Sequence, residues 1–416
     1  MIKIMLKNFF GSTFFTGSLL MFISLSVVNA GNYLFHLLSG RLLGPTLYGT
    51  LQSIISTLYL LNIIPLALSI IVMKFVALYG KDQEKINTFF NWLNLFLLKL
   101  SIIVTTILLV LVPLWMKFLK IDNPLSLIMA VLIVPVSLFT LASRSFLQGQ
   151  LKFFALCVSL ISEIFLKVFL MLIFIKLGWA VMGAVLSIIV SLLLSWIITT
   201  VISGYNFSFK QKYHFPQKRE IFSYSVPVVV STVAFSSLYT TDIILVKHFF
   251  TSFEAGIYAS LSVLGKVVYF ASFPINNVMF PLVANKYARK ESYENYFILS
   301  IIIVLLISTL ISAVYLFFPQ LMIGTLYGTK FLGGSGLLFL FGLFISLYAL
   351  ANTLNNFYLS VGKTRISFVS LIFSILQIVG LYFFHDSLKT VIVINIVISF
   401  LMVVCLLLYY PYVRKK

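Results

Sequence analysis

Long apolar runs separated by short polar breaks recur along the whole chain. Each run reaches the roughly 20 mainly apolar residues that an α-helix needs to cross the hydrocarbon of a membrane. Because no water satisfies backbone groups there, such runs predict helices rather than an open sheet. Charge clusters, Gly-Pro pairs and Asn-rich turns mark the breaks and predict twelve spans. They lie near residues 14–38, 46–79, 95–116, 125–147, 153–175, 179–203, 221–247, 254–283, 295–318, 334–360, 366–384 and 389–410.

The composition agrees with this pattern and excludes a soluble globule. Hydrophobic residues make up 61% of the chain and charged residues 9%, and the mean hydropathy is +1.11. We therefore predict an all-α integral membrane protein with no separate soluble domain. The two cysteines, Cys157 and Cys405, both lie in apolar spans without partners at metal spacing, so neither a disulfide framework nor a metal site is expected, and no cofactor is predicted.

The distribution of Lys and Arg predicts the orientation of the chain. Most of the 29 basic residues lie at the two termini and in the loops that follow even-numbered spans. Positively charged loops favour the cytoplasmic side. We expect a multi-pass protein of the cytoplasmic (inner) membrane with both termini in the cytoplasm. The net charge of +19 is then mainly a topology signal, and a nucleic-acid partner is not expected.

An internal repeat divides the chain into halves. Arg41 and Gly49 in the first half correspond to Lys247 and Gly256 in the second, close to half the length of 416 residues apart. An even number of helices in each half keeps both repeats the same way up. The prediction is two six-helix bundles around a central cleft: residues 1–203, a cytoplasmic linker at 204–220, and residues 221–416.

Several segments resemble one known family. These four segments are NYLFHLLSGRLLGPTLYGTLQSIISTLYLLNIIPLALSIIVMKFVA at 32–77, SRSFLQGQLKF at 143–153, KVVYFASFPINNVMFPLVANKYA at 266–288 and NNFYLSVGKTR at 355–365. They are similar to recurring segments of the polysaccharide-exporting flippases, the Wzx-type members of the multidrug, oligosaccharidyl-lipid and polysaccharide (MOP) exporter superfamily. The resemblance implies a MATE-like fold that alternates between inward-open and outward-open states and translocates an undecaprenyl- or similar polyprenyl-diphosphate-linked oligosaccharide.

A cation at membrane depth is the first candidate for binding such a cargo. Lys266 lies about 18 Å along a span that starts near Glu254, at about 1.5 Å per residue, which is close to the midplane. Charged residues at this depth are costly and usually functional. The resembling family also carries a basic residue facing the cavity in the corresponding segment. Snorkelling of Lys266 to an interface is the alternative.

Acidic residues inside spans are candidates for gating or ion coupling. Glu163 and Lys167 stand one helical turn apart in an order that favours an intrahelical pair. This pair either neutralises itself within the bundle or takes part in gating. Asp242 is interpreted either as a satisfied residue at a helix end near Lys247 or as a proton or sodium site.

Further substrate-binding candidates are basic or polar. Arg144 and Lys152 lie toward cytoplasmic ends, where they either snorkel or meet a diphosphate arriving from the cytoplasmic leaflet. Asn29, Asn32 and His36 form a polar stripe along one face of the first span. The stripe either hydrogen-bonds sugar hydroxyls or joins the helix to its neighbours.

Two other classes of protein stay open. A cation-coupled multidrug antiporter of the same superfamily would share the fold, but in that branch an acidic residue commonly occurs in the first helix, and the span 14–38 has none. A membrane glycosyltransferase or polymerase needs acids or bases on a sizeable outside loop, and the predicted loops are short. We therefore expect a transporter, not an enzyme, that works as a monomer in the lipid bilayer. A transmembrane ion gradient or membrane potential is a candidate energy source, and other polysaccharide-assembly proteins are candidate partners.

Overall fold

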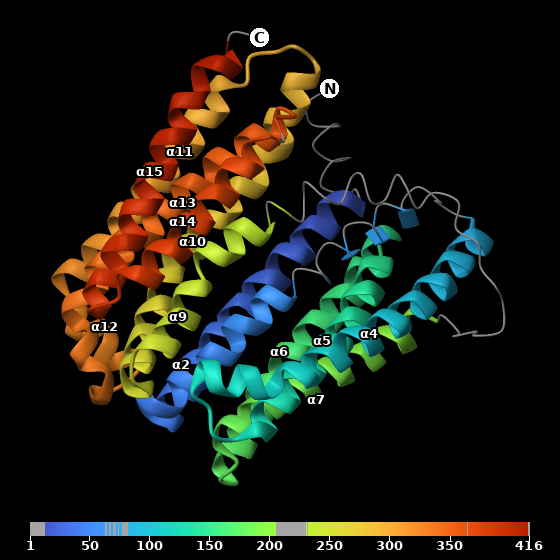
Figure 1. Cartoon of the computed structure of the whole chain (residues 1–416). Coiled ribbons are helices and arrows are strands. Elements are labelled where there is room, and N and C mark those ends of the chain that lie inside the picture. Colours follow the sequence, from blue (N-terminus) through green and yellow to red (C-terminus); the bar gives the residue numbers. More distant parts are fainter. Residues whose placement is uncertain are drawn as a thin grey trace. The chain divides into compact units, whose positions relative to one another are not determined.

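The computed structural model describes residues 13–62, 65, 68–69, 72–73, 75–76, 82–204, 230, 232–363 and 365–414. Every regular element among these residues is a helix (Figure 1). The helices are α2 (Thr13–Leu61), α4 (Gln83–Leu119), α5 (Pro124–Gly149), α6 (Phe153–Lys176), α7 (Ala180–Ser203), α9 (Thr241–Phe249), α10 (Ser252–Ala288), α11 (Glu294–Phe317), α12 (Pro319–Leu326), the 3₁₀ helix η1 (Thr329–Leu337), α13 (Leu338–Ser360), α14 (Ile366–Phe383) and α15 (Leu388–Arg414).

Most helices follow the predicted spans, but α4 begins twelve residues before the predicted span 95–116. Within the described residues, nine helices are long and apolar enough to cross a membrane. The predicted spans at 125–147, 153–175 and 179–203 each differ from α5, α6 and α7 by a few residues at most. Most of the predicted linker at 204–220, and parts of the spans at 46–79 and 221–247, lie outside the described residues.

The Gly-Pro pair after the first span breaks α2 into two helices. Gly44 has φ 72° and ψ 174°, a left-handed backbone conformation that glycine adopts without a steric penalty. Pro45 follows, where its fixed φ suits the first turn of a new helix. The break separates the first and second predicted spans, as the sequence indicated.

The described helices form two compact units. Unit 1 comprises Met1–Leu43 and Leu61–Ser225, and unit 2 comprises Gly44–Leu60 and Val226–Lys416. The boundary at Gly44 falls on the break in α2. Unit 2 thus contains a segment from the predicted N-terminal bundle, Gly44–Leu60, and the predicted division at the linker 204–220 stays a prediction.

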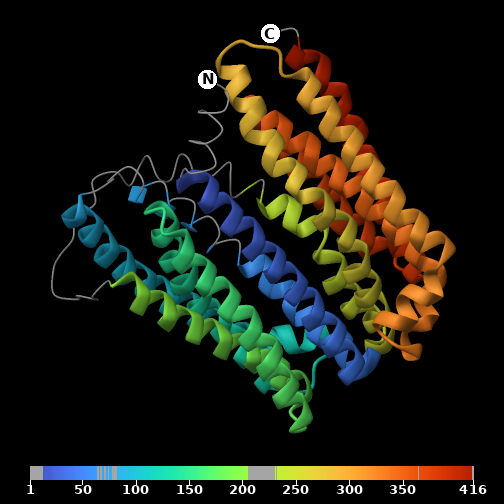
Figure 2. The ribbon, with the colours of Figure 1, turned by 180° about the vertical axis from the view of Figure 1, so that it is seen from behind.

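Each unit has its own packing arrangement. In unit 1, α7 packs against both α5 and α6, and α4 packs against α5 (Figure 2). In unit 2, α13 is the central helix, in contact with α10, α11 and α15. Its buried side chains, Phe357 and Tyr358 among them, form the centre of a hydrophobic core. Most of the polar groups described below lie on α2, α5, α6 and α7 in unit 1, and on α9, α10, α13, α14 and α15 in unit 2.

The segment Gly44–Leu60 is held tightly within unit 2. A Cβ atom on Gly49 would lie 2.6 Å from the backbone nitrogen of Gly256, and a Cβ atom on Gly256 would overlap the carbonyl group of Pro45. The Tyr48 hydroxyl lies 3.2 Å from the Tyr327 hydroxyl, in the connection after α12. The hydropathy pattern does not predict α12, which is shorter than a membrane span, and it covers only residues 334–337 of η1, at the start of the predicted span 334–360.

We expect Gly256→Ala to destabilise the folded protein. The new methyl group cannot be accommodated without moving the Pro45 backbone, and overpacking of this kind costs about 1–3 kcal/mol. The effect would be measured by heating the protein in detergent and then determining the remaining folded fraction by size-exclusion chromatography. Gly333→Ala is the matched control, because no atom lies within 4 Å of its added Cβ. Equal melting temperatures for the two variants would contradict the expectation.

Candidate functional site

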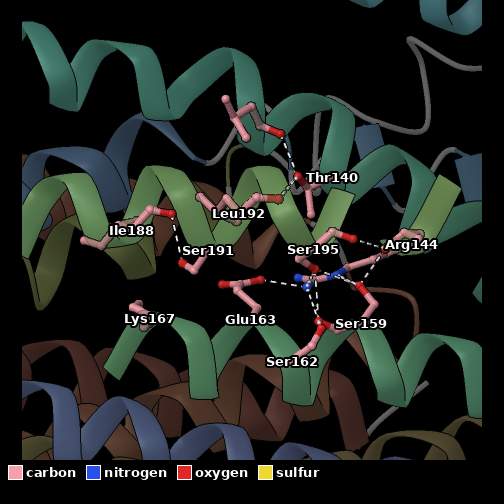
Figure 3. Close-up of polar contacts among 12 residues, drawn as sticks. Thr140, Arg144, Ser159, Ser162, Glu163, Lys167, Ile188, Ser191, Leu192 and Ser195 are labelled. Carbon is pink, nitrogen blue, oxygen red and sulfur yellow. Dashed lines mark hydrogen bonds and ion pairs between the residues drawn. The ribbon is translucent and has the colours of Figure 1, made fainter. Parts of the chain in front are cut away.

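An ion pair with little exposure to solvent joins α5 and α6 in unit 1. Arg144 on α5 pairs with Glu163 on α6 at 2.7 Å, with side-chain exposures of 9% and 19% (Figure 3). The Arg144 Nε donates to Ser159 Oγ at 2.9 Å. A terminal nitrogen donates to Ser159 O at 3.0 Å and to Ser195 Oγ at 2.7 Å. Arg144 is therefore bound by side chains and backbone of α6 and α7, apart from its ion pair.

The local sequence explains this arrangement. Ser159 and Glu163 are four residues apart on α6 and so lie on the same face. Ser195 and Thr199 repeat the spacing on α7, and their small side chains leave room for the guanidinium group. The Ser159 hydroxyl lies 2.9 Å from Ser195 Oγ and 2.7 Å from Thr199 Oγ1, which joins the two helices.

The predicted Glu163–Lys167 pair is not the one that forms. Glu163 makes its ion pair across helices with Arg144. Lys167 instead donates to Asn32 Oδ1 and places Nζ 5.3 Å from the centre of the Phe35 ring. Lys167 still lies close enough to Glu163 and Arg144 to interact with their charges. The guanidinium has several N–H donors, so Arg144 can pair with Glu163 and bond Ser159 and Ser195 at the same time.

The other predicted residues of unit 1 lie outside this cluster. Asn29 is exposed on α2, and His36 is half-buried with its ring against Phe35. Of the predicted polar stripe, the structure therefore brings only Asn32 to the charged cluster. Lys152 is exposed and precedes the first residue of α6. A role of Arg144, Lys152 and the stripe in substrate binding stays a prediction.

A second polar cluster lies in unit 2 around Asp242. Asp242 lies in the first turn of α9 and is fully buried. Its Oδ2 accepts a hydrogen bond from the Tyr258 hydroxyl at 2.6 Å, and its Oδ1 accepts from the backbone N–H of Ile243 at 2.8 Å. Asn395 donates to Asp242 Oδ2 at 3.5 Å and to the Tyr258 oxygen at 3.0 Å.

The cluster continues through Gln377 on α14. Its Nε2 donates to Asn395 Oδ1 at 2.8 Å and to Leu238 O at 2.9 Å. Asp242 is thus bound by neutral donors from α9, α10 and α15. The helix-end interpretation placed it near Lys247, but among the described residues no cation forms an ion pair with Asp242.

Lys266 lies on α10 in the same unit. Its side chain is buried, with 7% exposure, and Nζ lies 4.9 Å from the centre of the Tyr239 ring. Lys266 and Asp242 attract each other electrostatically. Within the described part of the chain, Lys266 forms no ion pair. The charge is therefore stabilised by a ring face and a carboxylate that is not in contact.

Two further ion pairs lie at helix ends and are exposed to solvent. Asp82 caps α4 and pairs with Lys85 at 2.8 Å, and Lys286 pairs with Glu291 at 3.0 Å. The hydrogen bond from Lys85 lowers the pKa of Asp82, and the one from Lys286 lowers the pKa of Glu291. All four are charged at neutral pH, and solvent-exposed pairs of this kind contribute little to stability.

Known structures show which class of protein has this fold. An inward-facing multidrug resistance MATE family transporter of the MOP superfamily is similar with a TM-score of 0.77 and 14% identity over 92% of this chain and 95% of that one. The lipid II flippase MurJ, in an inward closed conformation, is similar with a TM-score of 0.67 and 15% identity over 95% and 87%. A MOP superfamily transporter from Pyrococcus furiosus gives 0.61 and 16% over 96% and 95%. The fold is that of the MOP transporters.

The family follows from the sequence match. Residues 16–287 match the family described as polysaccharide biosynthesis protein, and this range is more than half of the chain. The chain therefore belongs to the polysaccharide biosynthesis protein family. No curated relative matches it. The predicted resemblance and the all-α membrane fold are both confirmed.

Proposed function

We propose that the protein is a flippase for a polyprenyl-diphosphate-linked oligosaccharide. It would move this lipid from the cytoplasmic to the outer leaflet by alternating access, as a step in cell-surface polysaccharide biosynthesis. The family match and the MOP fold support a membrane transporter rather than an enzyme. MurJ, which shares the fold, is itself a lipid II flippase. The proposed setting is the inner membrane, with both termini in the cytoplasm.

The observation that carries the proposal is the state of Lys266. A buried charge loses its hydration and is normally paired or hydrogen-bonded. Lys266 is buried in unit 2 with a ring face as its contact and no ion pair among the described residues. A diphosphate would supply the missing anion. Lys266 is thereby suited to bind the diphosphate of the lipid, a charged group that cannot enter hydrocarbon unaided.

The Asp242 cluster supports a role in ion coupling. Its carboxylate is buried among neutral donors, so a proton or a small cation would neutralise a charge that no cation contacts in the described structure. Asp242 and Lys266 attract each other electrostatically. An ion that neutralised Asp242 would remove this attraction and so change how strongly Lys266 binds an anion. Glu163 and Lys167 are retained as candidates for gating in unit 1.

A cation-coupled multidrug antiporter is the second candidate. The similarity to MATE structures and the buried Asp242 fit it. Lys266 does not, because a buried cation repels cationic drugs and no ion pair neutralises Lys266 within the described residues. A glycosyltransferase or polymerase has no support from the family or the fold.

Transport in vesicles separates these candidates. Purified protein would be reconstituted with a labelled polyprenyl-diphosphate sugar, and its movement to the opposite leaflet measured with and without an ion gradient. We expect movement of this lipid and stimulation by the gradient. Movement of cationic drugs alone would replace the flippase with the antiporter.

Asp242→Asn tests the coupling in the same assay. The amide keeps the shape and can still accept from Tyr258, but it carries no charge to neutralise. We expect transport at the gradient-free rate and loss of stimulation by the gradient. Asp122→Asn, at an exposed position, is the matched control. A normal gradient response in Asp242→Asn would exclude this residue from coupling.

A further inference from the structure

Three tyrosines of unit 2 form a cluster beside Lys266. Ring centres are 6.2 Å apart for Tyr239 and Tyr269, 5.5 Å for Tyr239 and Tyr348, and 5.2 Å for Tyr269 and Tyr348. Lys266 lies over the Tyr239 ring. Tyr348 is buried, whereas Tyr239 and Tyr269 are half-buried, so part of their surface is accessible. The tyrosine cluster thus lies at the edge of the hydrophobic core of unit 2, next to the buried Lys266.

An asparagine trio continues from the tyrosine cluster. Asn276 Nδ2 donates to Asn352 Oδ1 at 3.4 Å, and Asn356 Nδ2 donates to the same oxygen at 2.6 Å. Asn276 is buried at 4% exposure, and its Oδ1 has no hydrogen-bond partner among the described residues. A buried polar atom without a partner costs free energy, and most such atoms in proteins are satisfied. The oxygen is therefore an unsatisfied acceptor that a donor group of a ligand would satisfy.

The helix positions place these groups in one line. Tyr269 and Asn276 are seven residues apart on α10 and so share a face, and Tyr348 and Asn352 are four residues apart on α13. α10 and α13 pack directly against each other. From Lys266 to Asn276 the rise along α10 is about 15 Å at about 1.5 Å per residue. This length exceeds one sugar ring, so the cation and the trio can contact different parts of one ligand.

We infer that the tyrosine cluster and the asparagine trio bind the sugar portion of the lipid-linked glycan, next to a diphosphate held by Lys266. Sugar rings present apolar C–H faces that pack on aromatic rings, and hydroxyl or amide N–H groups that donate to an amide oxygen. Aromatic walls with a few placed polar groups are the usual lining of a small-molecule site. The inference rests on the proposed function and names what the same site recognises: hydroxyl-bearing sugar rings, in addition to the charged head.

Binding measurements with two lipids test this inference. The first probe is the lipid-linked glycan that accumulates in cells lacking this protein, and the second is polyprenyl diphosphate without sugar. Wild-type protein should bind the glycan lipid more tightly than the bare lipid. Asn276→Leu should weaken glycan binding about fivefold and Tyr269→Leu about tenfold, as expected for one lost hydrogen bond and one lost ring contact. Binding of the bare lipid should change by less than about twofold in both variants.

Matched variants separate binding from folding. Asn276→Leu removes an unsatisfied polar atom, and Asn352 Oδ1 keeps its bond from Asn356, so its melting temperature should not fall. Tyr269→Phe keeps the ring and should retain most of the glycan binding. Asn277→Leu alters the exposed neighbour on α10 and should behave as wild type.

The binding results separate a failure of the proposed sugar site from a failure of the proposed flippase function. If the wild type bound neither lipid, the proposed function would fail. If it bound both equally, or if Asn276→Leu and Tyr269→Leu kept the wild-type preference for the glycan lipid, the sugar site would be overturned while the flippase stood. If both variants lost binding of the two lipids equally, the sugar site would also be overturned. The residues would then affect the fold or the binding of the charged head.

Discussion

Lys266→Ala is expected to abolish export of the lipid-linked glycan while leaving the amount of folded protein unchanged. Within the described residues the ammonium group forms no ion pair, so its removal leaves no contacting carboxylate buried and unpaired. Truncating one partner of a buried charge pair costs about 2–5 kcal/mol of binding, or about 30-fold or more. Surface polysaccharide in a complemented deletion strain and flipping in vesicles are the two measurements.

Two further variants make this expectation specific. Lys266→Arg keeps a positive charge with a different shape and should retain part of the transport. Lys330→Ala removes an exposed lysine from the same unit and should transport normally. Normal export by Lys266→Ala at wild-type protein levels would remove this residue from the binding of the diphosphate.

The membrane helices could be predicted from the sequence because hydropathy alone determines them. α11 and α15 are continuous apolar stretches between polar breaks, and the predicted spans at 295–318 and 389–410 differ from them by a few residues. The break at Gly44 was equally visible, since a Gly-Pro pair disfavours a continuous helix. By contrast, α12 is a short helix of Pro319–Leu326, below the length at which a hydropathy pattern predicts a span.

The partners of the buried charges could not be predicted, because they come from different helices. The sequence indicated Asp242 and Lys266 as charges within spans, but packing alone brings Tyr258 and Asn395 to Asp242. Gln377 reaches Asn395 in the same way. Gln377 and Asn395 could have been found from the sequence, because each is a polar residue within an apolar span. Ser159 and Ser195 could not, since serines are frequent in membrane helices and most bond to their own backbone.

The error at Glu163 shows the limit of spacing rules. A one-turn spacing places Glu163 and Lys167 on one face, but the spacing carries no information about Arg144 on α5. The cross-helix pair forms because the guanidinium also receives three acceptor contacts from Ser159 and Ser195. An ammonium group on the same helix as Glu163 could not reach that set.

Arg144→Ala is the second variant with a large expected effect, in this case on folding. It leaves the half-buried Glu163 carboxylate without its paired cation and removes the bonds that join α5 to Ser159 and Ser195. Breaking a buried pair in this way costs about 3–5 kcal/mol, which is a large fraction of the stability of most proteins. We expect a strong loss of folded protein in detergent by size-exclusion chromatography, whereas the exposed Arg289→Ala should behave as wild type.

The double variant Arg144→Leu with Glu163→Leu separates structure from gating. Replacing a buried ion pair by apolar residues of similar volume is often neutral for stability, so folded protein should return. If glycan export returned with it, the pair would serve only to hold α5, α6 and α7 together. Folded double variant without export would assign the pair to the transport cycle, where Glu163 has two cations within electrostatic reach, Arg144 and Lys167. Wild-type stability of Arg144→Ala alone would contradict the whole expectation, because the carboxylate would then not need its partner.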